Sequence, residues 1–178
     1  HLALTEEAVR GYRTEAKMNP PLRSERDRQA VREALVDGVV DVIATDHAPH
    51  HYEEKEREFD DAPFGVVGLE TALGVAVTEL VETGLMDLPG LVDRLSCAPA
   101  RIMGLPVGTL EPGAPADVVV FDPEERWTVE PERFESKSRN TPFAGHALTG
   151  RVHHTLVGGV TRWATPSTSR ASETTSAR

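Results

Sequence analysis

Residues Val39 to His51 read V-V-D-V-I-A-T-D-H-A-P-H-H. The stretch begins with a mostly apolar run, which Gly38 precedes and Pro49 follows. This run predicts a buried strand, Val39–Ala44, in a parallel sheet. In α/β folds, functional sites are built just past the C-terminal ends of such strands. The residues found there in this sequence are polar: Thr45, Asp46, His47, His50 and His51.

Asp46 is the strongest candidate for chemistry in the chain. A carboxylate at a strand tip beside imidazoles can bind a metal ion and can also carry protons. Three histidines lie within five residues of Asp46, and only four others occur in the sequence. The alternative is that Asp46 serves only as a helix cap or turn former.

A helix is predicted before this strand, over Ser24–Asp37. Ser24 can cap it, with Asp27 as the partner in a capping box. Gly38 suits the C-terminal cap. The apolar stripe at helical spacing predicts its buried face, which consists of Ala30, Val31, Ala34 and Leu35. A helix followed closely by a buried strand is half of a repeating βα unit, so the sequence predicts the α/β class.

Asn19 is a second candidate for binding. It lies in K-M-N-P-P-L-R, where two consecutive prolines exclude a helix interior or a central strand. We therefore expect an extended loop that holds Asn19 stiffly. Its amide offers a donor and an acceptor, which suits an amide or carboxylate ligand. An ordinary turn former before proline is the alternative.

The segment from Tyr52 to Pro63 is densely charged and predicts a solvated loop or a short exposed helix beside the site. Phe64–Thr71 follows with two glycines, which allow either close approach of a ligand to the backbone or the packing of a helix start. Amphipathic helices are then expected over Leu69–Leu80 and Leu88–Leu105.

The pattern changes to β at about residue 108. Gly158-Gly159 indicates a two-residue hairpin between the last two strands. Thr165–Arg178 is rich in Ser and Thr without an apolar period, and we expect it to be disordered. The predicted strands are Ala116–Phe121, Trp127–Val129, Gly150–Val157 and Val160–Trp163.

Composition excludes several classes of protein. A net charge of -10 argues against a nucleic-acid partner, and no stretch approaches the roughly 20 apolar residues of a membrane span. The single cysteine, Cys97, allows no internal disulfide and favours a cytoplasmic location. The chain has 178 residues and begins with His1, so we expect the C-terminal piece of a longer protein or a partial sequence.

Several segments resemble one family. Between residues 17 and 145 the chain reads, in order, K-M-N-P-P-L-R, I-A-T-D-H-A-P-H, A-P-F-G-V-V-G-L-E-T, G-x-L-x-x-G-x-x-A-D-V-V-V-F-D and S-K-S-R-N-T-P-F-A-G. These motifs resemble the class I dihydroorotases of the amidohydrolase superfamily. The sister hydantoinases and allantoinases share P-P-L-R and the Asp-His pair, but usually differ at K-M-N and A-P-H.

The resemblance implies a fold as well. It implies a (β/α)8 TIM-like barrel with a small β-sandwich built from both chain ends. A complete barrel typically takes about 250 residues, so this chain would supply only its C-terminal part. We expect residues 1–105 to belong to the barrel, 106–164 to a small β-sandwich segment and 165–178 to a disordered tail.

The implied activity is the reversible cyclisation of N-carbamoyl-L-aspartate to dihydroorotate in pyrimidine biosynthesis. Asp46 matches the aspartate that ligates zinc and shuttles a proton. Asn19 and His50 match positions that bind the substrate, and Phe64 and Gly65 match the segment that closes over its ring. His47 and His51 follow the motif with a supporting or packing role.

The chain departs from the family in its metal ligands. The family's His-x-His pair, its bridging carboxylate or carboxylated lysine and two further histidines would all precede His1, and no His-x-His occurs in the sequence. We therefore expect one or two Zn2+ ions per full-length subunit and no activity of this chain alone, since zinc needs about four ligands.

Partners and rival functions follow from the same resemblance. The expected partners are the small-molecule substrate and either a second copy or an aspartate transcarbamoylase. The rival functions are a hydantoinase or allantoinase type of cyclic amidohydrolase, and a non-catalytic dihydroorotase-like subunit that supports a transcarbamoylase.

Overall fold

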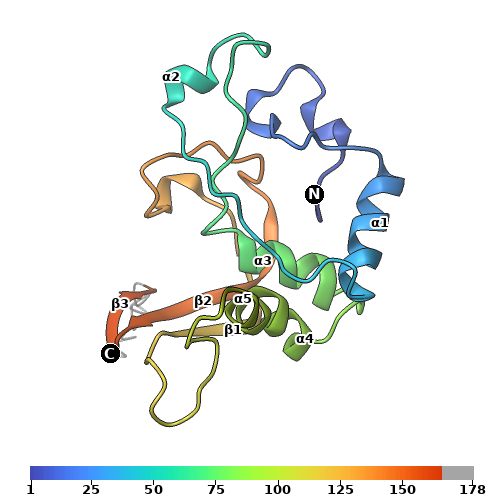
Figure 1. Ribbon diagram of the computed structural model, residues 1–178. Helices are drawn as coiled ribbons and strands as arrows, with labels where there is room; N and C mark the ends of the chain where they lie inside the picture. The colour runs from blue at the N-terminus through green and yellow to red at the C-terminus, as the bar shows by residue number, and fades with distance from the viewer. Residues whose placement is uncertain (166–178) are drawn as a thin grey trace, which may run out of the picture.

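The computed structural model describes residues 1–165. All but one of the helical elements lie in the first two thirds of the chain, joined by long loops, and an antiparallel sheet follows them (Figure 1). The predicted disordered tail lies outside the described residues, apart from Thr165. The helical elements are η1 (Glu6–Val9), η2 (Thr14–Ala16), α1 (Glu25–Val36), α2 (Tyr52–Lys55), α3 (Ala72–Ala76), η3 (Val77–Val81), α4 (Leu88–Val92), η4 (Asp93–Cys97), α5 (Ala98–Met103) and η5 (Pro131–Arg133).

Helix α1 begins as its sequence predicts. The Ser24 hydroxyl accepts from the Asp27 amide at 3.3 Å, and the Asp27 carboxylate accepts from the Ser24 amide at 3.1 Å, which completes the capping box. The predicted buried stripe is only partly right. Leu35 is buried, but Val31 is 39% exposed because it borders a cavity rather than a packed neighbour.

The prediction of a buried strand over Val39–Ala44 is wrong for the structure of residues 1–165. These residues form no strand, and Val39 is 77% exposed. The physical reason is the lack of a paired neighbour, since a strand needs a ladder of hydrogen bonds to an adjacent strand. Only isolated bonds hold the segment, such as Ile43 N–H to Arg94 O at 3.0 Å.

Two continuous helical stretches follow. The first, α3 with η3, begins at Ala72 rather than Leu69, and Leu69 is 62% exposed. The second runs from α4 through η4 to α5 and matches the predicted helix closely. It starts with the Asp87 side chain accepting from the Gly90 amide at 2.8 Å, and it ends at Gly104, whose φ of +64° suits a glycine cap.

The sheet contains β1 (Val118–Thr128), β2 (Ala147–Val157) and β3 (Val160–Ala164), in the order β1-β2-β3 and antiparallel throughout. Strand β1 joins two of the predicted strands across an irregularity between Asp122 and Arg126. The predicted Gly158-Gly159 hairpin is confirmed by the pairing of Val157 with Val160. Among residues 1–165, no helix is both long and apolar enough to span a bilayer.

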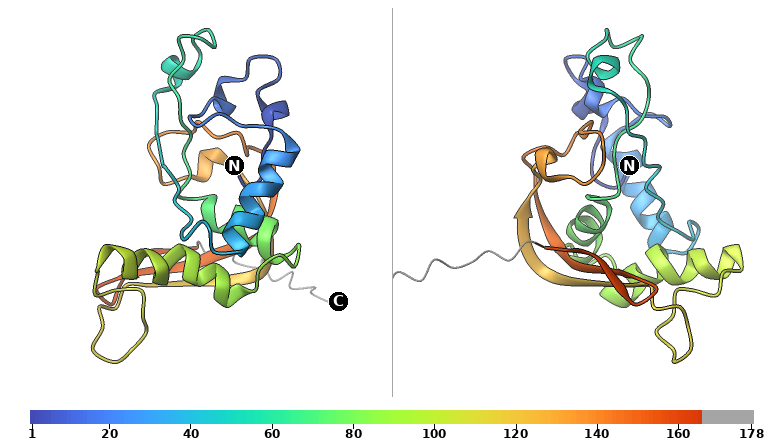
Figure 2. Two further views of the ribbon diagram at one scale, coloured as in Figure 1. Left: turned by 45° about the vertical axis from the view of Figure 1, so that its right-hand side comes forward. Right: turned by 90° about the vertical axis from the view of Figure 1, so that its left-hand side faces the viewer.

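The buried apolar side chains form two clusters where these elements pack together. One contains Leu80 and Leu91, neither of which is exposed. The other, around Val67 and Leu148, joins the loops to the sheet. Helix α3 packs on β2, whereas the segment with α2 extends away from the sheet (Figure 2). The outlying segment belongs to neither core cluster.

Candidate functional site

Asp46 lies at the border of a cavity of about 370 Å³. Its backbone is left-handed, with φ of 44°, a conformation that aspartate adopts more readily than most residues. Within the described part of the chain, its carboxylate has no hydrogen-bond or ion-pair partner. An exposed carboxylate beside a cavity is free to bind a cation or exchange a proton.

The cavity brings together three of the five residues chosen from the sequence. Asn19, Asp46 and Gly65 all line it, with an apolar wall that includes Leu35 and Ile43. Asn19 and Asp46 lie on separate segments that the fold brings to one concave surface. His50 and Phe64 are not among its lining residues, and they lie beside it through Gly65.

His50 and Phe64 contact each other. His50 Nε2 donates to the Phe64 carbonyl at 2.8 Å, so this imidazole nitrogen is already in use. Phe64 as a whole residue is 55% exposed. Gly65 has φ of +113°, and a Cβ there would lie 2.5 Å from the Ala48 Cβ, so only glycine allows the two segments to approach this closely.

The other two histidines of the stretch have structural contacts. His47 Nδ1 accepts from the Gly68 amide at 3.1 Å, which holds the turn before α3. His51 stands at the N-terminus of α2, where its amide donates to Glu54 at 3.2 Å, and its ring lies 4.5 Å from that of Tyr52.

Sequence reasoning missed Asn140, which lies near the centre of the site's hydrogen bonds. Its Nδ2 donates to the carbonyls of Ala48 at 3.0 Å and Gly65 at 3.1 Å, and its Oδ1 accepts from the His50 amide at 3.2 Å. The Ser138 hydroxyl lies within hydrogen-bond distance of the same Oδ1 and of the His50 carbonyl, and its single proton can be donated to either. The signal was present only as the motif S-K-S-R-N-T-P-F-A-G, which does not indicate these partners.

Two buried lysines were also missed. Lys17 is 7% exposed and Lys55 is 4% exposed, and both side chains reach the backbone of residues 59–65. Burial lowers the pKa of Lys55 below its ordinary value of 10.5, with the nearby charge of Lys17 acting in the same direction and Glu15 opposing it.

Two residues that line the cavity, Asp46 and His1, could act as zinc ligands, but His1 Nε2 already donates to the Pro20 carbonyl at 2.7 Å. Asp46 is a suitable oxygen ligand, but residues 1–165 place no further His, Cys, Asp or Glu donors with it as a cluster of three. Because a zinc site needs about four ligands, these residues do not form one by themselves.

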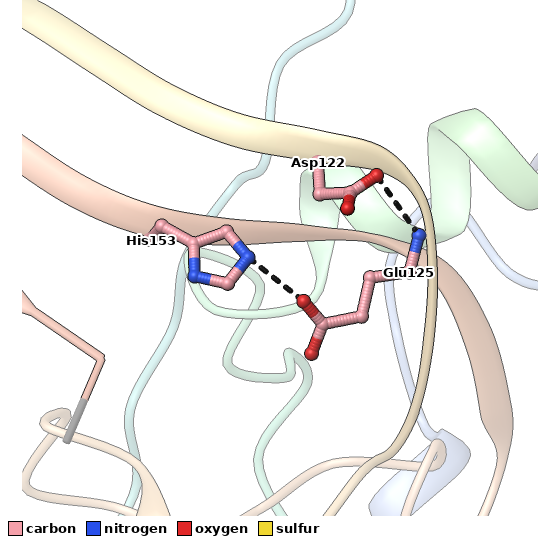
Figure 3. Close-up of side chains that lie close together, drawn as sticks. All are labelled: Asp122, Glu125 and His153. Atoms are coloured by element: carbon pink, nitrogen blue, oxygen red, sulfur yellow. Dashed lines mark hydrogen bonds and ion pairs between the residues drawn. The ribbon is translucent and has the colours of Figure 1, made fainter. Parts of the chain in front are cut away.

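One such cluster does occur, on the sheet, and consists of Asp122, Glu125 and His153 (Figure 3). Each of its three side chains already has a hydrogen-bond partner within the protein. Asp122 accepts from the Glu125 amide at 3.2 Å, while Glu125 accepts from Arg151 at 2.8 Å and from His153 at 2.7 Å. The cluster is therefore an ion-pair network that joins β1 to β2.

Comparison with known proteins identifies the family. The profile of the amidohydrolase family matches residues 2–162. The chain belongs to the amidohydrolase family. This amidohydrolase chain is 54% identical over 159 residues to a dihydroorotase of Geobacter metallireducens and 57% identical over 159 residues to one of Pelotomaculum thermopropionicum. Each alignment covers 89% of this chain and 37% of the relative, so the chain spans little more than a third of their length.

The fold of a solved structure supports the family assignment. The L-hydantoinase of Arthrobacter aurescens, named also as a dihydropyrimidinase, matches this amidohydrolase chain with a TM-score of 0.82 and 31% identity. The match covers 89% of this chain and 36% of the hydantoinase chain. The helices and the small antiparallel sheet described above are therefore an arrangement found within a larger amidohydrolase fold.

Proposed function

We propose that this chain forms the substrate-binding and proton-transfer part of a dihydroorotase, which interconverts N-carbamoyl-L-aspartate and dihydroorotate in pyrimidine biosynthesis. The observation that carries the proposal is the meeting of Asn19, Asp46 and Gly65 at one cavity. Identities of 54% and 57% to proteins named dihydroorotase support it.

The proposed reaction needs a group that moves one proton. In ring opening, water adds to the ring carbonyl, the C–N bond breaks and the leaving nitrogen must receive a proton. Asp46 takes the proton from the water and delivers it to that nitrogen, and its freedom from internal partners suits this exchange. A bound zinc ion would polarise the carbonyl and acidify the water, with Asp46 as one of its ligands.

The remaining roles concern binding. Asn19 offers a donor and an acceptor to the substrate's carboxylate and ring edge. His50 binds the same groups through Nδ1, which lies 3.7 Å from the Glu54 carboxylate and does not contact Phe64. The backbone of Phe64 and Gly65 covers the ring, since the glycine allows close approach.

The proposed architecture extends beyond the described elements. Residues 1–105 belong to the C-terminal part of a (β/α)8 TIM-like barrel, and 106–164 to a small β-sandwich segment. The rest of the barrel would supply the remaining metal ligands and the neighbour that pairs with Val39–Ala44. A cytoplasmic location, and a homodimer or a complex with aspartate transcarbamoylase, belong to the same proposal.

A hydantoinase is the second candidate, favoured by the structural match to L-hydantoinase at 31% identity. The two differ in substrate, so kinetics separate them. The protein that carries this chain, at its full natural length and with zinc, is assayed on dihydroorotate, hydantoin and allantoin.

We expect kcat/KM for dihydroorotate to exceed the others by at least about 100-fold, because a site that binds a carboxylate rejects ligands lacking it. A preference for hydantoin or allantoin would contradict the proposal. Inactivity on all three substrates would favour a non-catalytic subunit.

A further inference from the structure

Lys17 and Lys55 are buried charges with an unusual set of partners. Burying an ammonium group is costly unless it is paired or fully hydrogen-bonded. Neither lysine forms an ion pair within residues 1–165. Many carboxylates are nearby in the sequence, including Glu53, Glu54 and Asp61, yet the two lysines contact backbone carbonyls instead.

The two ammonium groups bind backbone carbonyls in neighbouring parts of one segment, residues 59–65. Lys17 donates to the carbonyls of Phe59, of Asp60 at 3.1 Å and of Ala62 at 2.6 Å. Lys55 donates to the carbonyls of Pro63 at 2.9 Å and Gly65 at 3.2 Å. Because an ammonium has three donors, Lys17 has each of its donors matched by a carbonyl.

Further contacts hold Lys17 in place. Its Nζ lies 5.1 Å from the centroid of the Phe59 ring and 4.7 Å from that of Phe64, within cation–π range. Its own backbone carbonyl accepts from the Gly65 amide at 2.9 Å. Thr14 donates to the Lys55 carbonyl, which fixes the second lysine to η2. Residues 59–65 contain no helix or strand, and the two lysines supply five of the hydrogen bonds to their carbonyls, beside one from Asn140 to Gly65 and one from His50 to Phe64.

This segment ends at the candidate site. Gly65 lines the cavity with Asp46, and the Phe64 carbonyl accepts from His50. We propose that Lys17 and Lys55 are positioning residues, which bind the carbonyls of residues 59–65 and so hold Phe64, Gly65 and His50 where they contact the substrate. The part of this inference that concerns substrate rests on the proposed function.

The test compares Lys17→Met and Lys55→Met with Lys137→Met, a control at an exposed lysine, all in the full-length protein. Methionine keeps an apolar stem of similar length and removes the donors. The first measurement, hydrogen exchange followed by mass spectrometry, does not depend on activity. We expect exchange in residues 59–68 to rise about tenfold in both variants, while the amides of α1 and β2 and the whole control protein stay unchanged.

The second measurement separates positioning from simple structural support. We expect Lys17→Met to raise KM for dihydroorotate about tenfold while kcat stays within about threefold, because the reacting group Asp46 is untouched. Lys17→Arg, which restores donors, should recover part of the affinity.

The outcomes are distinguishable. Unchanged exchange in residues 59–68, or exchange that rises equally throughout the protein in both variants, would overturn the positioning role. If the unmodified full-length protein is inactive on dihydroorotate, the proposed function is wrong. Faster exchange confined to residues 59–68 in the two lysine variants would still support the positioning role of the lysines.

Discussion

Asn140 shows how one side chain can join two segments of a site. It is 7% exposed and binds both the stretch around His50 and the backbone at Gly65. Its own carbonyl accepts from the Val67 amide at 2.9 Å, which adds a backbone link. Asn140 therefore adds to the direct links between the two segments, which are the His50–Phe64 hydrogen bond and the bond from the Ala48 amide to the Val66 carbonyl at 2.9 Å.

Replacing Asn140 tests this contribution. We expect Asn140→Ala to lower the free energy of unfolding by about 2–3 kcal/mol, because buried carbonyls and an amide lose their partners. Asn140→Asp has nearly the same shape, but it turns a carboxylate oxygen toward the carbonyls of Ala48 and Gly65. It should be at least as destabilising at neutral pH. Urea unfolding measures both, and an aspartate variant as stable as the unmodified protein would show that the donated bonds contribute little.

At the residue scale, some residues of the candidate site could be predicted from the sequence and others could not. Asp46 was found because three histidines follow it closely, Asn19 because two prolines follow it, and Gly65 because its segment matches a motif of the family. Asn140 and Lys17 were missed because their partners are backbone atoms far along the chain, and the side-chain pattern does not record such partners. Lys55 was assigned to a solvated loop for the same reason.

Elements whose signals are local were predicted well. The capping box of α1, the glycine that ends α5 and the hairpin between β2 and β3 each depend on neighbouring residues. The strand expected over Val39–Ala44 depends on a distant partner, and it is not formed among residues 1–165. The apolar side chains of this segment suit a buried position, but they do not by themselves supply the hydrogen bonds to a neighbouring strand that define a β-strand.

Glu82 connects the helical elements to the sheet. It follows η3, and its carboxylate accepts from Arg126 at 2.7 Å and from Thr149 at 3.0 Å. The hydrogen bond from Arg126, and then that from Thr149, lower the pKa of Glu82 below its ordinary value of 4.5. The ionised carboxylate is therefore favoured in the folded state.

This shift predicts how stability depends on pH. A carboxyl group with a lowered pKa in the folded state stabilises the protein above the unfolded value of 4.5, and the contribution is lost as pH falls through the folded pKa. We expect the stability advantage over Glu82→Gln to be constant above about pH 5.5 and to shrink below 4.5. Urea unfolding from pH 7 to pH 3 measures it. The difference between the unmodified protein and Glu124→Gln, at an exposed glutamate, should not change in this way. If the unfolding free energies of Glu82→Gln and the unmodified protein differ by the same amount at every pH, Glu82 does not contribute to the pH dependence.

At the scale of the whole molecule, the site is an assembly of distant segments. The loop with Asn19, the stretch with Asp46 and the turn with Gly65 meet at one cavity. The family resemblance indicated that these residues belong to one site, whereas the physical pattern of each segment did not indicate how they would meet. Their meeting depends on the buried contacts of Asn140, Lys17 and Lys55, which tie the segments together.

The most direct measurement is steady-state kinetics of Asp46→Asn in the full-length, zinc-loaded protein, followed in both directions between N-carbamoyl-L-aspartate and dihydroorotate. The matched control is Asp41→Asn, at an exposed aspartate of the same stretch. We expect Asp46→Asn, compared at equal zinc content, to lower kcat by about 1,000-fold because the proton carrier is lost, and the control to keep full activity. An Asp46→Asn protein that retains kcat within about threefold of the unmodified protein would contradict the assignment of proton transfer to this carboxylate.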